Sequence, residues 1–255
     1  MKVAGSVGVI TGGGGGLGGG VARMLVEGGG KAVILDLESS GGAELAASLG
    51  PNALFIPTDV TDSTQIERAI EQAVEQAGRI DLCVNAAGIS PAHRVVDRKG
   101  RVHPLEVFEK TIDVNLIGAF DVLRHAAKAM TRNEPGQDGE RGLIVNVSSA
   151  AGLEGQPGQA AYTASKGALV ALTLQLARDL AVWGIRVMTI APGIMDTPML
   201  AGIDEKRRSQ LIDLHVFPKR LGTPEDFAAL VRCFMEVTLL NGECVRLDAA
   251  TRLGP

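Results

Sequence analysis

Three side chains in the second half of the chain are of types that can move a proton. Tyr162 and Lys166 are spaced so that on a helix they share one face. Ser149 precedes them directly after an apolar stretch, where its hydroxyl can turn toward the same point. A phenol with a pKa of about 10 is a poor base at neutral pH, but a nearby ammonium lowers that pKa. The set predicts a tyrosine acid/base, with a half-buried tyrosine beside a solvated lysine as the alternative.

A run of glycines after the first apolar stretch is the second chemical signal. The spacing of Gly12, Gly16 and Gly18 differs from the common GxGxxG pattern. Glycine nevertheless lets the backbone approach a pyrophosphate at a helix N-terminus, here of a helix that begins near Leu17. The next apolar stretch ends in Asp36, whose carboxylate can accept hydrogen bonds from ribose hydroxyls and would repel a 2′-phosphate. These residues favour NAD over NADP, with a flexible loop and an ordinary strand-end carboxylate as the alternatives.

Short apolar stretches alternate with longer amphipathic ones along the chain, and these must position the side chains above. The expected strands are 7–10, 32–36, 53–57, 81–85, 143–147, 185–190 and 244–247, and the clearest helices are 63–77, 105–130, 162–182 and 224–237. Alternating strands and helices form βαβ units. We therefore expect an α/β fold, in which residues 1–255 make one Rossmann-type domain with a doubly wound parallel sheet and helices on both faces.

Composition excludes several classes of function. The chain has 25 Lys and Arg against 29 Asp and Glu, so no overall basic field is available for nucleic acid or an anionic membrane. Its three cysteines form no CxxC pair, and we expect reduced thiols and no metal site. No apolar run reaches the roughly 18 residues that span a bilayer, and the first residues lack the pattern of a targeting signal. We expect a cytoplasmic protein that binds neither nucleic acid nor membrane.

Several motifs occur in the order and spacing of one enzyme family. They are residues 11–18, residues 85–88 (Asn-Ala-Ala-Gly), Asn115, Ser149, residues 162–166 (Tyr-Thr-Ala-Ser-Lys) and residues 192–193 (Pro-Gly). Over residues 7–248 the chain resembles the short-chain dehydrogenase/reductase family. Residues 133–142, 154–162, 186–193 and 241–248 are similar to its 3-hydroxyacyl-CoA dehydrogenase type 2 group, also called 17β-hydroxysteroid dehydrogenase type 10.

The resemblance implies an activity and an assembly. It implies NAD as cofactor, a homotetramer built through the two long helices, and interconversion of L-3-hydroxyacyl-CoA and 3-oxoacyl-CoA, with tolerance for branched acyl chains and steroid alcohols. A hydroxysteroid or other hydrophobic-alcohol dehydrogenase and a 3-oxoacyl-carrier-protein reductase are alternative enzymes, although the latter normally uses NADPH, which Asp36 disfavours. A non-catalytic scaffold subunit is the alternative outside enzymes.

The resemblance also assigns roles to the catalytic residues. Tyr162 takes the proton of the substrate hydroxyl while a hydride passes to the nicotinamide, and Ser149 hydrogen-bonds the substrate oxygen. Lys166 binds the nicotinamide ribose and, with the positive nicotinamide, lowers the pKa of Tyr162. Asn115 holds a water that links Lys166 to solvent; a helix-surface amide is the alternative for this residue.

By the same resemblance, two further sets contact the ligands. The substrate is expected at Ser149, Gln156 and Tyr162. The cofactor is expected at Gly12, Gly16, Leu17, Gly18, Asp36, Asp59, Val60, Ala87, Gly88, Tyr162, Lys166, Pro192, Gly193 and Thr197. Two of these have alternative roles: Asp59 could cap a helix, and Thr197 could be a turn residue.

Two segments suggest what kind of substrate is bound. Residues 194–218 are apolar enough to form a lid over an acyl chain or sterol, or else to pack a connecting helix into the core. Residues 93–103 are locally basic and could contact the phosphates of coenzyme A, or could simply be a solvated loop. A third segment departs from the family: residues 248–250 read Asp-Ala-Ala where many relatives have a glycine-rich turn.

Overall fold

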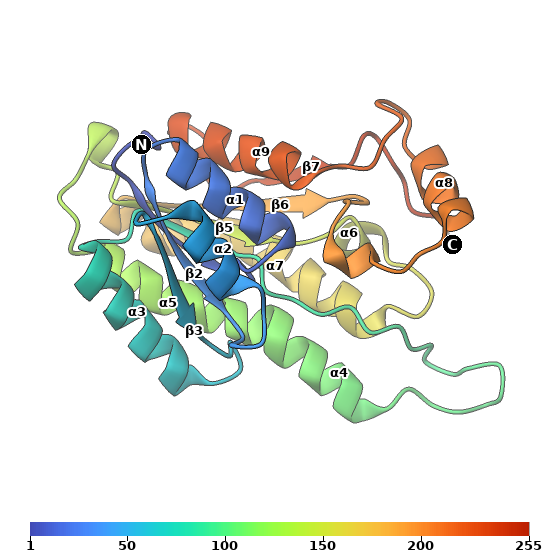
Figure 1. The fold of residues 1–255 in the computed structure, drawn as a ribbon. Coiled ribbons are helices and arrows are strands. Elements are labelled where there is room, and N and C mark those ends of the chain that lie inside the picture. The colour runs from blue at the N-terminus through green and yellow to red at the C-terminus, as the bar shows by residue number, and fades with distance from the viewer. Residues whose placement is uncertain (255) are drawn as a thin grey trace.

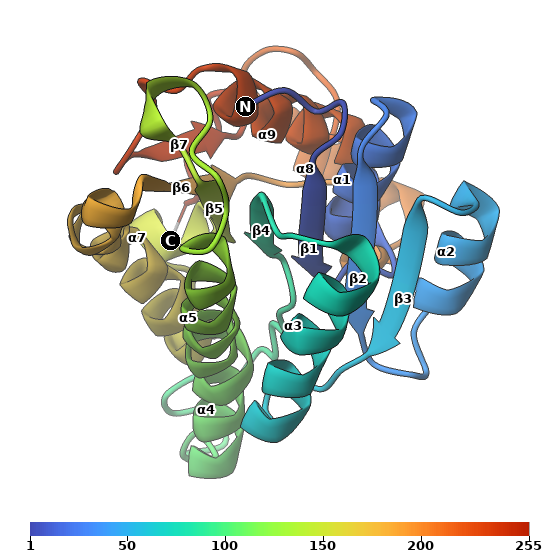
Figure 2. The same ribbon diagram turned by 90° about the vertical axis from the view of Figure 1, so that its left-hand side faces the viewer.

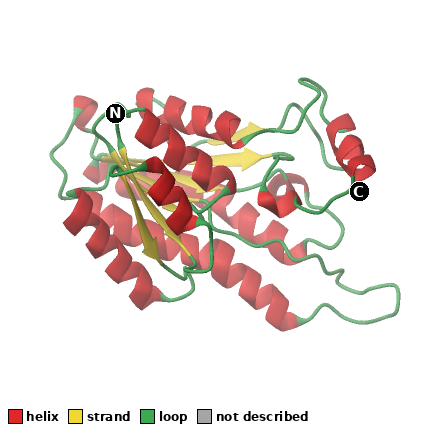
Figure 3. Ribbon diagram, in the orientation of Figure 1, coloured by secondary structure: helices red, strands yellow, loops and turns green. Residues whose placement is uncertain are grey.

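The computed structural model describes residues 1–254, and its centre is one parallel sheet of seven strands in the order β3-β2-β1-β4-β5-β6-β7. Every strand pairing is parallel. Figure 3 shows the strands as one layer between helices. The strands are β1 (Val7–Thr11), β2 (Lys31–Asp36), β3 (Ala53–Pro57), β4 (Leu82–Asn85), β5 (Gly142–Val147), β6 (Ile185–Pro192) and β7 (Cys244–Leu247).

Helices cover both faces of this sheet (Figures 1 and 2). One apolar core lies between the sheet and α1, α2 and α9, and a second lies between the sheet and α3, α5 and α7. Every residue of β1, β5 and β6 is buried, as expected for central parallel strands. The helices are α1 (Gly16–Glu27), α2 (Gly42–Leu49), α3 (Ser63–Ala77), α4 (Leu105–Ile112), α5 (Ala119–Met130), α6 (Ala151–Glu154), α7 (Ala160–Leu180), α8 (Glu205–Asp213) and α9 (Pro224–Glu236).

The predicted fold class is confirmed, and the deviations from the expected elements are local. Strands at 53–57 and 244–247 and the helix at 63–77 have the expected bounds. The helix expected over 105–130 is divided into α4, the π-helical turn η1 (Asp113–Gly118) and α5. A π-turn holds one more residue per turn than an α-helix, and periodicity cannot predict it. The helix expected over 162–182 ends earlier, with the 3₁₀ turn η3 (Ala181–Trp183) after α7.

The strand order decides where a ligand can bind. The chain runs outward from β1 through β2 to β3 and then returns to β4 on the other side of β1. The loops that leave β1 and β4 therefore diverge, and such a reversal opens a crevice at the carboxyl edge of the sheet. Two segments project beyond the sheet at the right of Figure 1: α8, and the long loop that leads into α4. Within residues 1–254, no helix has the length and apolar character required to cross a membrane.

Candidate active site

A cleft of about 790 Å³ lies at the carboxyl edge of the sheet. Its walls come from the turns after β1 to β6, so residues far apart in the sequence meet there. All the residues expected to contact cofactor or substrate line this cleft, among them Asp36, Gly88, Gln156 and Thr197. Asn115 is the one expected site residue that does not line it.

The turn between β1 and α1 is built from glycines for steric reasons. Gly12 has φ +62°, and a Cβ there would lie 2.8 Å from the backbone nitrogen of Ala87. A Cβ on Gly18 would lie 2.5 Å from the carbonyl oxygen of Gly12. Both contacts are closer than a Cβ tolerates, so a larger residue would push this turn away from β4 or from α1.

Helix α1 presents its first turn to the cleft without a protein partner. Its N-cap, Gly15, provides no side-chain hydrogen bond, and the first turn carries no acidic residue. A Cβ on Gly15 would find only Pro198 Cγ, at 4.0 Å, so the space in front of the turn is open. Unpaired N–H groups and the helix dipole favour an anion at such a position. The residues present therefore fit the pyrophosphate of a dinucleotide.

Asp36 lies at the end of β2, beside this turn. Its Oδ2 accepts a hydrogen bond from the Gly14 N–H at 2.9 Å, and its Oδ1 accepts one from the Leu37 N–H at 2.8 Å. These bonds fix the carboxylate at the rim of the cleft and leave lone pairs for ribose hydroxyls. The described lining of the cleft contains no arginine; its cationic side chains are Lys110 and Lys166.

Asp59 and Val60 form the neighbouring wall, after β3. Asp59 Oδ1 accepts hydrogen bonds from the N–H and the hydroxyl of Thr61, both at 2.8 Å, and these bonds lower the pKa of Asp59. The cap of α3 is Asp62, so the alternative in which Asp59 caps this helix is wrong. Val60 is buried against Gly118 of η1.

The residues expected to transfer the proton lie together in the cleft. Lys166 Nζ is 5.8 Å from the centre of the Tyr162 ring and donates to the Val147 carbonyl at 2.7 Å. Ser149 Oγ accepts from the Ala151 N–H at 3.1 Å, which holds the serine at the start of α6. Helix α7 provides Tyr162 and Lys166 on one face, as their spacing predicts.

Burial controls the proton affinities of this set. Burial lowers the pKa of Lys166 to about 8. Burial also raises the pKa of Tyr162, and the hydrogen bond of the Ser149 side chain opposes that rise. The net shift in this chain is upward; the lowering expected from the sequence involves the Lys166 ammonium together with the nicotinamide of a bound cofactor.

Asn115 supports the site from behind. Its side chain is fully buried in η1, so the alternative of a helix-surface amide is wrong. Its Nδ2 donates to the Ile89 carbonyl at 2.9 Å and to Ser165 Oγ at 3.1 Å, while Oδ1 accepts from the Ile89 N–H at 2.8 Å. A Cβ on Gly88 would lie 3.2 Å from this Oδ1 and 3.3 Å from Lys166 Nζ. Asn115 thus ties the turn after β4 to α7.

Of the segment at 194–218, Met195 packs into the apolar core, whereas the helix of the segment, α8, does not. None of the residues of α8 is buried, and Phe217 is 81% exposed. The segment leaves β6 at Pro192 and Gly193 and covers one side of the cleft with Thr197 and the 3₁₀ turn η4 (Pro198–Leu200).

The basic loop forms a small hairpin that does not itself line the cleft, although His93 pairs with Gln159, which does. Val96 pairs with Val102 in an antiparallel bridge, and Asp97 accepts from the N–H groups of Lys99 and Arg101. Arg101 is paired with Asp97, which neutralises one of the positive charges of the hairpin.

Sequence reasoning missed several cleft residues, among them Ser40, Lys110 and Leu253. Leu253 lines the cleft although it lies outside the motifs, after the last of them at 241–248. Its backbone N–H donates to Glu154 at 2.6 Å. No pattern in the sequence signals this contact, because it joins residues that are almost a hundred positions apart.

The fold and the site together define an α/β oxidoreductase. Its parallel sheet carries, at the carboxyl edge, a glycine turn at a free helix N-terminus and a Ser–Tyr–Lys set in one cleft. Comparison with known proteins agrees: the sequence profile described as short chain dehydrogenase matches residues 6–208. The chain belongs to the short-chain dehydrogenase family.

Individual relatives match over the whole chain. The 3-hydroxyacyl-CoA dehydrogenase type-2 of Homo sapiens is 50% identical over 255 residues, covering 100% of this chain and 98% of the relative. That of Drosophila melanogaster is 46% identical, covering 99% of this chain and 100% of the relative. A crystal structure of 3-hydroxyacyl-CoA dehydrogenase type-2 from Mycobacterium avium superposes with a TM-score of 0.92 at 42% identity, covering 99% of this chain and 97% of that one. The resemblance stated from the motifs is confirmed.

Proposed function

We propose that this chain is an NAD-dependent dehydrogenase that interconverts L-3-hydroxyacyl-CoA and 3-oxoacyl-CoA. The observation that carries the proposal is the meeting of Ser149, Tyr162 and Lys166 in the same cleft as the free N-terminus of α1. Relatives of similar length whose names state 3-hydroxyacyl-CoA dehydrogenase support the substrate class. In this proposal residues 1–255 act as one cofactor-binding domain, with residues 194–218 as a substrate lid.

The proposed reaction gives each polar group a task. Tyr162 accepts the hydroxyl proton of the alcohol as the carbon–oxygen bond becomes a carbonyl, and returns the proton in the reverse direction. Ser149 donates a hydrogen bond to the same oxygen and keeps it near the phenol. Lys166 hydrogen-bonds the nicotinamide ribose through Nζ. Bound NAD would supply the hydride acceptor and a positive charge near Tyr162, in addition to that of Lys166.

The cofactor is assigned to the glycine turn and the strand ends. The N–H groups at Gly16, Leu17 and Gly18 would hold the pyrophosphate. The carboxylate of Asp36 would bind the adenosine ribose and disfavour a 2′-phosphate. The adenine would lie against Asp59 and Val60, and the nicotinamide against Pro192, Gly193 and Thr197, all of which line the cleft.

The substrate would enter between the lid and the hairpin. Gln156 is the polar contact proposed for the substrate, and exposed apolar side chains of the lid, such as Met199, suit an acyl chain. The hairpin would meet the phosphates of coenzyme A through Arg98 and Lys99. Replacing Arg98, Lys99 and Arg101 together should raise KM for a CoA ester and spare a short substrate without CoA; equal effects on both would refute this role.

Three finer expectations complete the proposal. We propose a homotetramer because η1, α5 and α7 each carry an exposed apolar side chain. A cytoplasmic location remains the expectation from the sequence. The alternative substrate, a steroid or other hydrophobic alcohol, is favoured by the same apolar lid, since it needs no hairpin contact.

The deciding experiment follows NADH formation from NAD and L-3-hydroxybutyryl-CoA. NADP, a steroid alcohol and the Tyr162→Phe protein are run beside it. Turnover with NAD that falls by at least about a hundredfold in Tyr162→Phe would support cofactor, substrate and acid/base together. Turnover with the steroid alone would support the proposed chemistry but would make a steroid alcohol, not a CoA ester, the substrate. NADH binding without any turnover would favour a scaffold subunit.

A further inference from the structure

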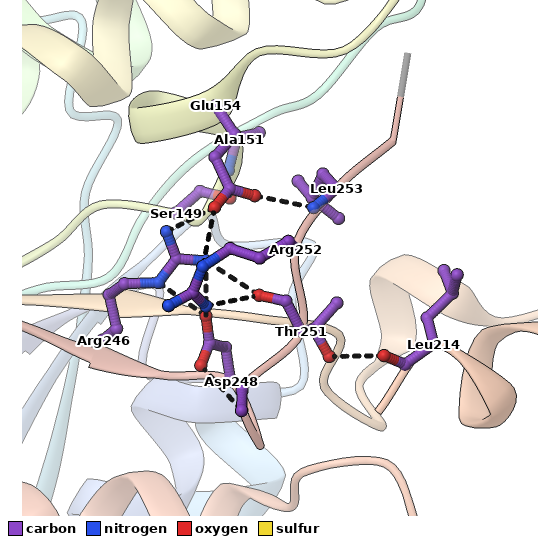
Figure 4. A network of polar contacts seen from close by, with 10 residues as sticks. Ser149, Ala151, Glu154, Leu214, Arg246, Asp248, Thr251, Arg252 and Leu253 are labelled. Atoms are coloured by element: carbon purple, nitrogen blue, oxygen red, sulfur yellow. Dashed lines mark hydrogen bonds and ion pairs between the residues drawn. The ribbon is translucent and has the colours of Figure 1, made fainter. Parts of the chain in front are cut away.

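A set of ion pairs joins β7 to the helix that follows the proposed catalytic serine (Figure 4). Arg246 Nη1 donates to Glu154 Oε1 at 2.7 Å, and Arg246 Nε donates to Asp248 Oδ2 at 2.6 Å. Glu154 is the last residue of α6, and Ser149 is held at the start of that helix by the Ala151 N–H. The ion pairs therefore fix the end of β7 against the segment that carries Ser149.

The same carboxylate holds the chain segment beyond β7, residues 249–254, which we call the tail. The second oxygen of Glu154 accepts from the Leu253 N–H at 2.6 Å. The hydroxyl of Thr251 donates to the Leu214 carbonyl at 3.3 Å, at the end of α8. The tail is thus attached to α6 on one side and to the lid on the other, as Figure 4 shows.

The Leu253 side chain is placed where substrate would lie. It is half-buried and lines the same cleft as Met199 and Leu200 of the lid. An isobutyl group at this place occupies volume that an acyl chain would otherwise fill. Burial raises the pKa of Glu154, but hydrogen bonds from Arg246 and Leu253 outweigh this effect and lower it. The carboxylate is therefore charged at neutral pH and can accept both bonds.

We propose that Leu253 limits the length of acyl chain that the cleft accepts, and that Glu154 is the positioning residue that keeps Leu253 there. The inference rests on the proposed function, since it needs an acyl substrate. It does not depend on the identity of the acid/base, because neither residue touches Tyr162 in the contacts above.

The test compares kcat/KM for L-3-hydroxybutyryl-CoA, L-3-hydroxyoctanoyl-CoA and L-3-hydroxyhexadecanoyl-CoA. Leu253→Ala should raise the value for the longest ester on the order of tenfold and leave the shortest within about twofold, because only the longest chain reaches the space that is freed. Leu253→Trp should lower it for the longer esters. The control is Leu239→Ala, a leucine that is 94% exposed and outside the cleft lining.

Glu154→Gln tests the positioning role. Arg246 and the Leu253 N–H bind different oxygens of Glu154, and glutamine replaces one of these oxygens by an NH2 group that cannot accept. One of the two contacts is therefore lost, so the tail should loosen and the chain-length profile should shift as in Leu253→Ala, through KM for the long esters. A uniform loss of kcat over all three esters would overturn this role. Leu253 variants with an unchanged profile, in an enzyme that oxidises the esters, would overturn the inference alone. A wild-type enzyme that binds NADH and oxidises none of them would overturn the proposed function, and the inference with it.

Discussion

At the residue scale, burial favours the neutral form of both a basic and an acidic side chain. It lowers the pKa of the Lys166 ammonium to about 8 and raises that of the Tyr162 phenol. A neutral phenol is the form needed to protonate a ketone, whereas alcohol oxidation needs the phenolate. In the proposed mechanism, the direction of the reaction is therefore coupled to pH through Tyr162.

Ser149→Ala should move that pH dependence upward. The Ser149 hydrogen bond lowers the pKa of Tyr162, so its loss raises that pKa. The rise of kcat/KM for oxidation with pH, and the fall for reduction, should both shift to higher pH in the variant. Ser90→Ala, at another serine of the cleft lining, is the control and should leave both profiles in place. Profiles of Ser149→Ala that coincide with those of the wild type would contradict the prediction.

Asp36→Asn should reduce the preference for NADH over NADPH. A charged acceptor for the ribose is lost and the repulsion of a 2′-phosphate is removed, so NADH affinity should fall about tenfold while NADPH affinity rises. Titrations of NADH and NADPH fluorescence measure both. Glu38→Gln removes the same charge from an exposed position two residues away and should change neither affinity. An equal effect of the two variants would show that the overall negative charge, and not a specific contact of Asp36 with the cofactor, determines the preference.

At the element scale, the site is assembled from strand ends and helix starts. Helix α1 is left uncapped, whereas α3 is capped by Asp62 and α9 by the reciprocal pair Thr223 and Asp226. Of these three helices, only α1, which lacks a cap, begins at the cleft. The lid, in contrast, is attached by side chains: Arg208 of α8 pairs with both oxygens of Asp196, at 3.1 and 2.6 Å.

Arg208→Ala should loosen the lid without changing cofactor binding. The pair is partly exposed, so the effect should be modest: KM for L-3-hydroxybutyryl-CoA should rise by about two- to fivefold with little change in NADH affinity. Steady-state kinetics and an NADH titration measure the two quantities. Arg207→Ala, at the neighbouring position of α8, is the control. An equal rise in both variants would mean that helix charge, not the bond to Asp196, is responsible.

At the scale of the whole molecule, one sheet carries both halves of the cleft. The turns after β1, β2 and β3 make the first half, and those after β4, β5 and β6 make the second. On the outer side of the helices that support the second half, Ile117, Phe120 and Leu174 are 55%, 43% and 48% exposed. Apolar side chains of this size on adjacent helices suit burial against another copy of the chain.

Replacing Ile117 and Phe120 together by glutamate should break the assembly. The wild type should have the mass of four chains by light scattering, and the variant a smaller one, because charge on this face opposes its burial. Gln76→Glu, on the exposed side of α3, is the control and should leave the mass unchanged. A wild-type mass of one chain would refute the tetramer, and an unchanged mass in the variant would place the interface elsewhere.

The sequence by itself determined the fold class and most of the site. Apolar runs buried on both faces, and glycines where only a missing Cβ fits, are local signals, and so is the helical spacing of Tyr162 and Lys166. Only the tertiary structure decided the π-turn at Asn115, the raised pKa of Tyr162 and the contact of Leu253 with Glu154. A π-turn depends on what packs beside the helix, a pKa on total burial, and a contact over so long a separation on the path of the folded chain. None of these leaves a periodic trace in the sequence.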